Sequence, residues 1–220
     1  MSFSLIFKDE LIGFYKSKVM IFLWFGLTAL AVLVHLTSSN DIDGMSLSIL
    51  TALLVSSISG LLSSVMLAVN IINEKDTRVY DLFLIRPIKR WYILVSKFLA
   101  VYLCVSIACI IAISVGVLID YSESQIFFES IMKNVADSFI MTLSIIGISS
   151  AFGILIGVVS SSIIVGVILV IFVGNYISVI PTLPLILNIS NPVVIVIIIG
   201  VIFTTVLMTL SILIFNRKQF

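Results

Sequence analysis

The chain has 220 residues, of which 61% are apolar and only 10% are charged, and its formal net charge is +1. Globular domains are roughly 45–50% apolar and about 25% charged, so this composition excludes a water-soluble domain and predicts a multi-pass membrane protein. The nearly neutral balance gives no reason to expect a nucleic-acid partner.

Residues 1–18 are predicted to form an amphipathic helix at the cytoplasmic interface. Its apolar residues recur at helical spacing, and they are Phe3, Phe7, Leu11, Phe14 and Tyr15. The charged residues fill the other positions, and they are Lys8, Asp9, Glu10, Lys16 and Lys18. Such a helix lies on the membrane with its apolar face down and its lysines toward anionic headgroups. This helix serves either only to anchor the chain at the membrane surface or as a mechanical connection between the first span and a cytoplasmic partner.

Long windows without acidic or basic residues predict six membrane-spanning helices between residues 19 and 215. We place them near 19–36, 46–72, 92–119, 138–158, 161–180 and 193–215. The last uncharged window is long enough for three spans, and two interruptions divide it. One is the serine cluster at Val159–Ser162, and the other is the proline-rich stretch Pro181–Pro192, which we expect to form a short outer element that gates release.

The positions of the basic residues predict the orientation. With six spans and a cytoplasmic N-terminus, every Lys and Arg except Lys133 lies on or beside the inner face, and residues 216–220 form a cytoplasmic tail. The outer segments carry acidic residues instead: Asp41, Asp43, Asp120, Glu123, Glu129 and Asp137. The chain is therefore expected in the cell membrane, surrounded by lipid, with both termini in the cytoplasm.

The segment 73–91 is the one long cytoplasmic loop that this topology predicts, and it mixes acidic and basic residues. Asp76 or Thr77 is a suitable N-cap for a short helix, and Pro87 would end that helix and begin the next. Basic residues alone would fix the orientation, so a purely topogenic loop has no need of Glu74, Asp76 and Asp81. The mixed charge favours a docking surface over a topogenic loop.

The run IINEKDTRVYDLFLIRPIKRWYILVSKFLA resembles the signature loop of ABC-2-type permeases, the membrane subunits of one class of ATP-driven exporter. The residues that match the family pattern are Glu74, Thr77, Leu82, Pro87, Arg90 and Lys97. One departure is Asp76, where the family commonly has glycine. The resemblance implies an all-α membrane protein with six transmembrane helices, an N-terminal interfacial helix and a cytoplasmic coupling helix between spans 2 and 3.

The resemblance also implies partners. The coupling helix would contact a separate ABC ATP-binding subunit, which would bind ATP and magnesium, and a second permease subunit, identical or a sibling, would complete the membrane domain. The residues expected at the ATPase contact are Glu74, Lys75, Asp76, Thr77, Arg78, Tyr80, Asp81, Arg86, Pro87 and Arg90.

No pattern in the sequence indicates catalysis by this chain. A phosphate-binding loop needs a Gly-Lys pair, and the sequence has none, so ATP hydrolysis is assigned to the partner. His35 is the only histidine, and we interpret it as structural or interfacial. Cys104 and Cys109 lie about 140° apart around a helix, so neither a metal site nor a disulfide framework is expected.

Small and hydroxyl residues in the spans are candidates either for close helix packing or for a substrate path. Ser149, Gly153 and Gly157 form a seam that favours packing. The candidate path residues are Ser56, Ser59, Ser63, Asn70 and Asn175. The resemblance implies that the second and fifth spans border the central cavity, which makes Asn175 a candidate wall residue.

A path without charge suits an apolar or amphipathic cargo, such as a membrane-active peptide, a drug-like molecule or a lipid. The function predicted is therefore that of a permease subunit that moves such a substrate by alternating access. The alternative is a non-transporting membrane protein, such as an immunity or assembly factor, that docks a cytoplasmic partner. A secondary carrier is disfavoured because the spans hold no ionisable residue near mid-depth.

Overall fold

The computed structural model describes residues 3–37, 47–77, 90–123, 128–186 and 192–217, and these residues are helical almost throughout, without a β-strand. The elements are α1 (Phe3–Tyr15), α2 (Lys18–Thr37), α3 (Leu47–Asp76), α5 (Arg90–Glu123), α6 (Phe128–Val159), α7 (Ile163–Val179), the 3-10 turn η1 (Ile180–Thr182), α8 (Leu183–Ile186) and α9 (Pro192–Arg217). The prediction of an all-α protein is confirmed.

Five stretches are long and apolar enough to cross a membrane, and they lie in α3, α5, α6, α7 with η1, and α9. The bent pair α1 and α2, whose axes differ by 61°, provides a sixth if it is counted as one span. The chain therefore has the character of a multi-pass membrane protein, with five or six candidate spans among the described residues. The predicted orientation and the exact number of crossings stay predictions.

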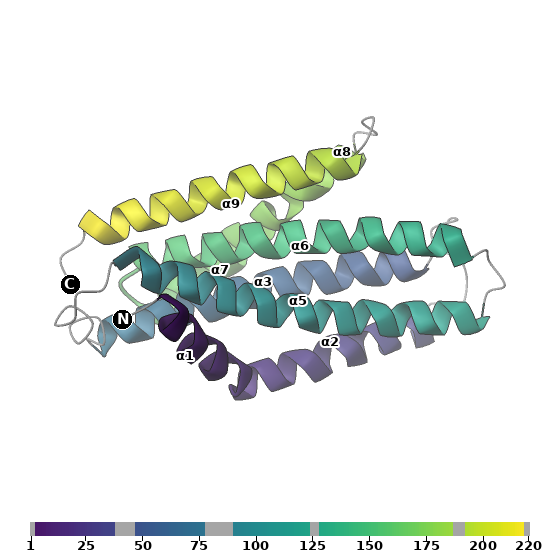
Figure 1. Cartoon of the computed structure of the whole chain (residues 1–220), viewed down its shortest axis with the longest axis horizontal. Helices are drawn as coiled ribbons and strands as arrows, with labels where there is room; N and C mark the ends of the chain where they lie inside the picture. The colour runs from purple at the N-terminus through teal and green to yellow at the C-terminus, as the bar shows by residue number, and fades with distance from the viewer. Residues whose placement is uncertain (1–2, 38–46, 78–89, 124–127, 187–191, 218–220) are drawn as a thin grey trace.

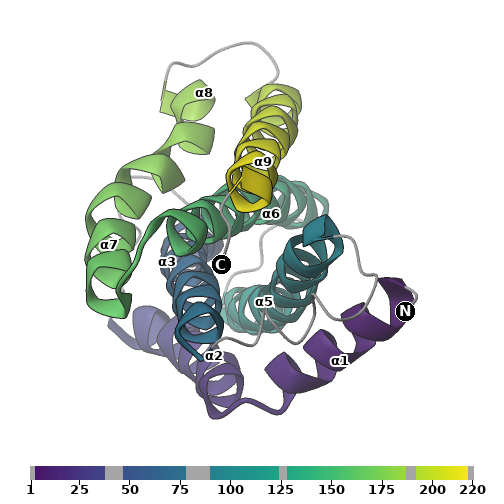
Figure 2. The same cartoon turned by 90° about the vertical axis from the view of Figure 1, so that its left-hand side faces the viewer.

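The long helices run side by side along one axis, with α3, α5 and α6 in the middle, and the short α1 lies at an angle to them (Figure 1). Seen end-on, α7 and α9 lie at the periphery on the side away from α1 (Figure 2). The spans in α7 and α9 are mostly exposed, whereas the span in α6 is mostly buried. α1 begins, and α9 ends, at the end of the bundle where α3 stops and α5 begins, which we call the loop end.

The two predicted interruptions coincide with helix ends. α6 ends at Val159 and α7 begins at Ile163, so the serine cluster separates two helices. The proline-rich stretch begins with η1 and the four-residue α8, and α9 starts at Pro192. Proline fixes a helical φ and lacks an amide hydrogen, so it suits the first position of a helix. Release gating by this element stays a prediction.

Some helix ends differ from those expected. α5 continues to Glu123 and α6 begins at Phe128, so helix replaces much of the expected outer loop. α3 continues through Asp76, and the Thr77 amide still donates to the Asn73 carbonyl. Asp76 belongs to the last turn of α3, which leaves Thr77 as the predicted N-cap, and the helix that it would begin lies outside the described residues.

α3 and α6 form the most extensive helix pair of the structure. A Cβ atom at Gly153 would lie 2.6 Å from the Ser64 Cα, so only glycine allows these two backbones to approach so closely. Gly60 and Gly157 also face the neighbouring helix, with less overlap: a Cβ atom would lie 3.0 Å from Ser149 Oγ at Gly60 and 3.0 Å from Ile71 Cβ at Gly157. The predicted small-residue seam on α6 is confirmed as helix packing.

Candidate functional site

A buried cluster of charged and amide side chains joins α1, α3 and α5 near the loop end. The Lys97 ammonium lies 2.7 Å from Glu10 Oε1 and 2.6 Å from Glu74 Oε1, and it donates to Asn70 Oδ1 at 3.0 Å. The Lys97 side chain is only 1% exposed, against 19% for Glu10 and 22% for Glu74. We call Glu10, Asn70, Glu74 and Lys97 the loop-end cluster, and it connects three separate helices through one cation.

The residue after Glu74 makes a second connection, to a different helix. Lys75 Nζ donates to the carbonyl oxygens of Gly157, Val158 and Ser160, at 3.3, 3.1 and 2.6 Å. The last carbonyls of a helix have no partner within that helix, and they carry partial negative charge that attracts a cation. The last turn of α3 is therefore bonded to α5 and α1 through Glu74, and to the end of α6 through Lys75.

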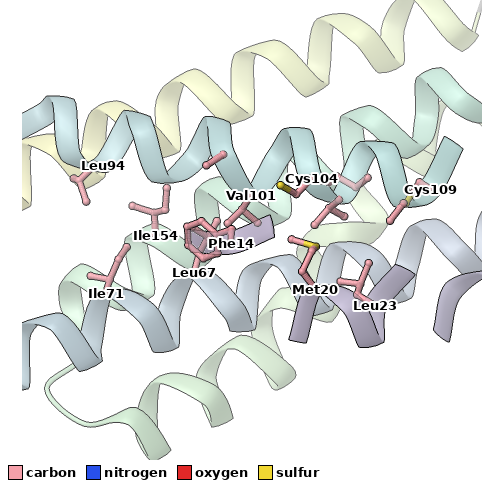
Figure 3. Close-up of a cluster of buried hydrophobic side chains, with 14 of the residues drawn as sticks. Phe14, Met20, Leu23, Leu67, Ile71, Leu94, Val101, Cys104, Cys109 and Ile154 are labelled. Atoms are coloured by element: carbon pink, nitrogen blue, oxygen red, sulfur yellow. The ribbon is translucent and has the colours of Figure 1, made fainter. Parts of the chain in front are cut away.

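Phe14 fixes α1 against the bundle close to this cluster. Its ring is 4% exposed, and it belongs to the same buried apolar cluster as Val101 of α5 and Leu67 of α3 (Figure 3). The Lys97 ammonium is 6.0 Å from the centre of the same ring. Ile6 is buried as well. Part of the apolar face of α1 therefore packs on protein, whereas Tyr15 is exposed, as are Lys8 and Lys16, and the predicted contact of this helix with lipid stays a prediction.

The loop-end cluster contains two carboxylates and one ammonium, so it is not balanced in charge when both acids are ionised. Burial raises the pKa of Glu10 above its ordinary value of 4.5, and this effect outweighs the opposing attraction to Lys97. Glu10 lies on α1, which precedes the first predicted span (19–36) and is outside the five stretches that could each cross a membrane alone. The second carboxylate oxygen of Glu74 is buried without a hydrogen-bond partner among the described residues. The cluster thus has more acceptor capacity than its single cation fills.

The predicted ATPase-contact residues lie at different places. Glu74 and Lys75 face other helices of the same chain, whereas Asp76 and Thr77 are exposed at the end of α3. Arg90 begins α5. The remaining ones, Arg78, Tyr80, Asp81, Arg86 and Pro87, lie outside the described residues, as does the predicted coupling helix.

The five candidate path residues are not brought onto one wall within the single chain. Ser56, Ser59 and Ser63 are buried inside the bundle, and Ser150 of α6 donates to Ser63 Oγ at 3.2 Å. Their face therefore serves helix packing, one of the two roles left open by the sequence. Asn70 belongs to the loop-end cluster, and Asn175 is exposed on α7.

The inward position of Glu10 and the partners of Lys97 were not predicted from the sequence. Glu10 was expected on the polar face of α1, but it shares a face with Phe14 and meets Lys97. Lys97 was treated as a basic residue at the membrane boundary, yet it follows Leu94 and precedes Val101 on the buried face of α5. Charged residues inside apolar helical stripes were the available signal, because such residues need partners when buried.

Comparison with known proteins adds no family assignment. No protein-family model matches the chain, and no curated protein matches its sequence.

Proposed function

We propose that this chain is the membrane subunit of an ABC-2-type exporter. It would move an apolar or amphipathic substrate across the cell membrane, by alternating access, with energy from a separate ATP-binding subunit. The chain itself would not be an enzyme, and ATP and magnesium would bind to the partner. The resemblance of residues 71–100 to the family loop and the membrane-spanning character of the helices support this proposal.

One observation carries the mechanism: the helix that leads into the segment 78–89 is bonded to its neighbours on both sides. Glu74 binds Lys97 of α5, which also binds Glu10 of α1, and Lys75 binds the end of α6. Charged hydrogen bonds of this kind are short and directional. A displacement of the segment by a partner would therefore move α1, α3, α5 and the end of α6 together.

A consequence is that Glu74 acts through Lys97 as a positioning residue, because its carboxylate faces inward. Arg86 is the better candidate for direct contact with the partner, on the sequence pattern alone. Arg86→Ala should therefore weaken partner binding without disturbing the loop-end cluster. Glu74→Gln should leave the partner bound but lower the coupling of ATP hydrolysis to transport.

The test is purification of the tagged chain from its native membrane in mild detergent, followed by mass spectrometry. We expect a stoichiometric partner with a nucleotide-binding loop, and its yield should fall with Arg86→Ala. Lys133→Ala is the matched control, since it removes one positive charge from the segment predicted to lie outside. A chain that purifies alone, or with a partner lacking a nucleotide site, would refute the exporter and favour the docking factor.

A further inference from the structure

A pocket of about 560 Å³ lies where α1 turns into α2, against one side of α3. Glu10, Gly13 and Phe14 line it from α1, and Ser17 lines it at the bend. The α3 side is a continuous stripe of residues: Leu62, Val65, Met66, Val69, Asn70 and Asn73. The pocket thus combines a carboxylate with a wall that changes from apolar to polar toward the loop end.

The order of these side chains matches the order of groups in an amphiphile. Asn70, Asn73 and Glu10 lie at one end, and the stripe from Val69 back to Leu62 is apolar. Leu62 and Asn73 are eleven residues apart on α3, which corresponds to about 16 Å along a helix. Half of a hydrocarbon core is about 15 Å. An apolar chain along this stripe would span roughly one leaflet, with its head group beside Glu10.

The charge of the pocket selects the head group. The residues that line it include Glu10 but neither Lys nor Arg. Lys97 is shared between Glu10 and Glu74, so the two carboxylates exceed the one ammonium. A cationic head group would add the missing positive charge, whereas an anionic head group would be repelled in this poorly solvated position.

We propose that this pocket binds a cationic amphiphile, with a protonated amine beside Glu10 and Asn70 and an apolar chain along Leu62–Val69. Binding at the pocket is a property of this chain alone. The further statement that the amphiphile is cargo rests on the proposed exporter function, and it narrows the cargo from amphipathic molecules in general to cationic ones.

The direct test uses the full chain in phosphatidylcholine nanodiscs and the probe 12-(dansylamino)dodecylamine. The matched neutral probe is 12-(dansylamino)dodecanol, and empty nanodiscs give the partitioning of each probe into lipid. We expect the amine to bind about tenfold more tightly than the alcohol, because one nearby charge contributes at least that factor in a partly buried site. Glu10→Gln should remove this preference, and Asp9→Asn, an exposed neighbour on the same helix, should retain it.

A second variant tests the pocket without changing its charge. Gly13 lines the pocket, and a Cβ atom there would meet no atom within 4 Å, so Gly13→Leu adds a side chain at the pocket wall at a position with open space. Leucine also favours a helix over glycine, so α1 should stay folded. Gly13→Leu should weaken binding of both probes about tenfold or more. Gly26→Leu, a similar exchange in α2 away from the pocket, should have no effect.

The results separate this proposal from the exporter function. Equal binding of amine and alcohol to the wild-type chain, or unchanged binding to Gly13→Leu, would overturn the pocket whether or not an ATPase purifies with the chain. Displacement of the amine by phosphatidylethanolamine at bilayer fractions would overturn the cargo statement, since the pocket would then hold membrane lipid. A bound amine together with an absent ATPase would refute the exporter and leave the pocket standing.

Discussion

Two regions of the bundle bury polar groups in opposite ways. In the seam between α3 and α6, Ser63 donates to the Gly60 carbonyl at 2.8 Å and Ser64 to the Leu61 carbonyl at 2.7 Å, within their own helix. In the loop-end cluster, Lys97 bonds across to α3 and α1. Ser63 and Ser64 thus bond their own helix, with one added bond from Ser150 of α6 to Ser63 Oγ, whereas the hydrogen bonds of the cluster require three helices in place.

The seam between α3 and α6 is thus stabilised mainly by close packing, whereas the loop-end cluster is stabilised mainly by interactions between charged groups. Ser63 and Ser64 keep these bonds wherever the facing helix lies, so along the seam the distance between α3 and α6 is set mainly by close fit. The cluster loses hydrogen bonds as soon as α1, α3 or α5 moves, and an unpaired buried charge is costly. The cluster is therefore the part of the molecule that responds to a displacement of α3, which is the property a coupling site needs.

The largest effect is expected from breaking the fit of the seam with Gly153→Leu. Its Cβ would overlap the backbone of Ser64, and no change of rotamer relieves a contact with backbone. α3 and α6 would have to separate, and we expect a loss of about 4 kcal/mol or more in the free energy of unfolding. Thermal unfolding in mild detergent measures this loss.

Gly13→Leu is the control, because it is the same exchange at a position with open space. It should leave the unfolding temperature unchanged or raise it slightly. If Gly153→Leu and Gly13→Leu unfold at similar temperatures, the seam is not held by shape.

A smaller loss is expected when the loop-end cluster loses its cation through Lys97→Met. Methionine fills a similar volume, but Glu10 and Glu74 are then left largely buried without a positive partner. We expect a loss of about 3 kcal/mol, the low end for a broken buried pair, because both carboxylates keep some access to water. The same unfolding measurement applies.

Two comparisons sharpen this result. Adding Glu10→Gln and Glu74→Gln to Lys97→Met should restore most of the lost stability, since neutral amides need no cation. Ser64→Ala removes a seam hydroxyl that bonds its own helix, and we expect it to cost at most about 1 kcal/mol. The absence of rescue in the triple variant would mean that Lys97 acts through its packing, without regard to charge.

The parts of the fold that depend on transfer from water to lipid could be predicted from the sequence. Uncharged windows indicated where α2, α3, α5, α6, α7 and α9 lie, and the serine and proline interruptions indicated breaks between them. The seam was predictable because small residues at helical spacing permit close approach. These features depend on residues that are close together in the sequence, or on hydropathy summed over a stretch of the chain.

The remaining features depend on which helices meet. The hydropathy pattern indicates where a helix is expected to leave the lipid, but the helix continues into water as long as its backbone hydrogen bonds are satisfied. The extensions of α5 and α6 beyond their apolar stretches were therefore not predicted. Asp76 has the chemistry of an N-cap, but α3 was already helical there and continued through it. The partners of Lys97 come from residues 10, 70 and 74, and only the tertiary arrangement brings them together.

The finest test of the cluster is its response to pH. Because burial raises the pKa of Glu10 above 4.5, the folded chain holds this proton more tightly than the unfolded chain. The protonated acid therefore favours folding below pH 4.5, and this contribution is lost as pH rises through the raised pKa. The unfolding temperature of the wild type, relative to Glu10→Gln, should fall over that window.

Lys97→Met removes the cation that opposes the rise in the pKa of Glu10. The unfolding temperature of Lys97→Met, relative to the double variant Lys97→Met with Glu10→Gln, should therefore fall more steeply, and the fall should extend to higher pH. A difference in unfolding temperature between wild type and Glu10→Gln that stays constant with pH would show that Glu10 is solvated like a surface carboxylate. The loop-end cluster would then not be a buried site.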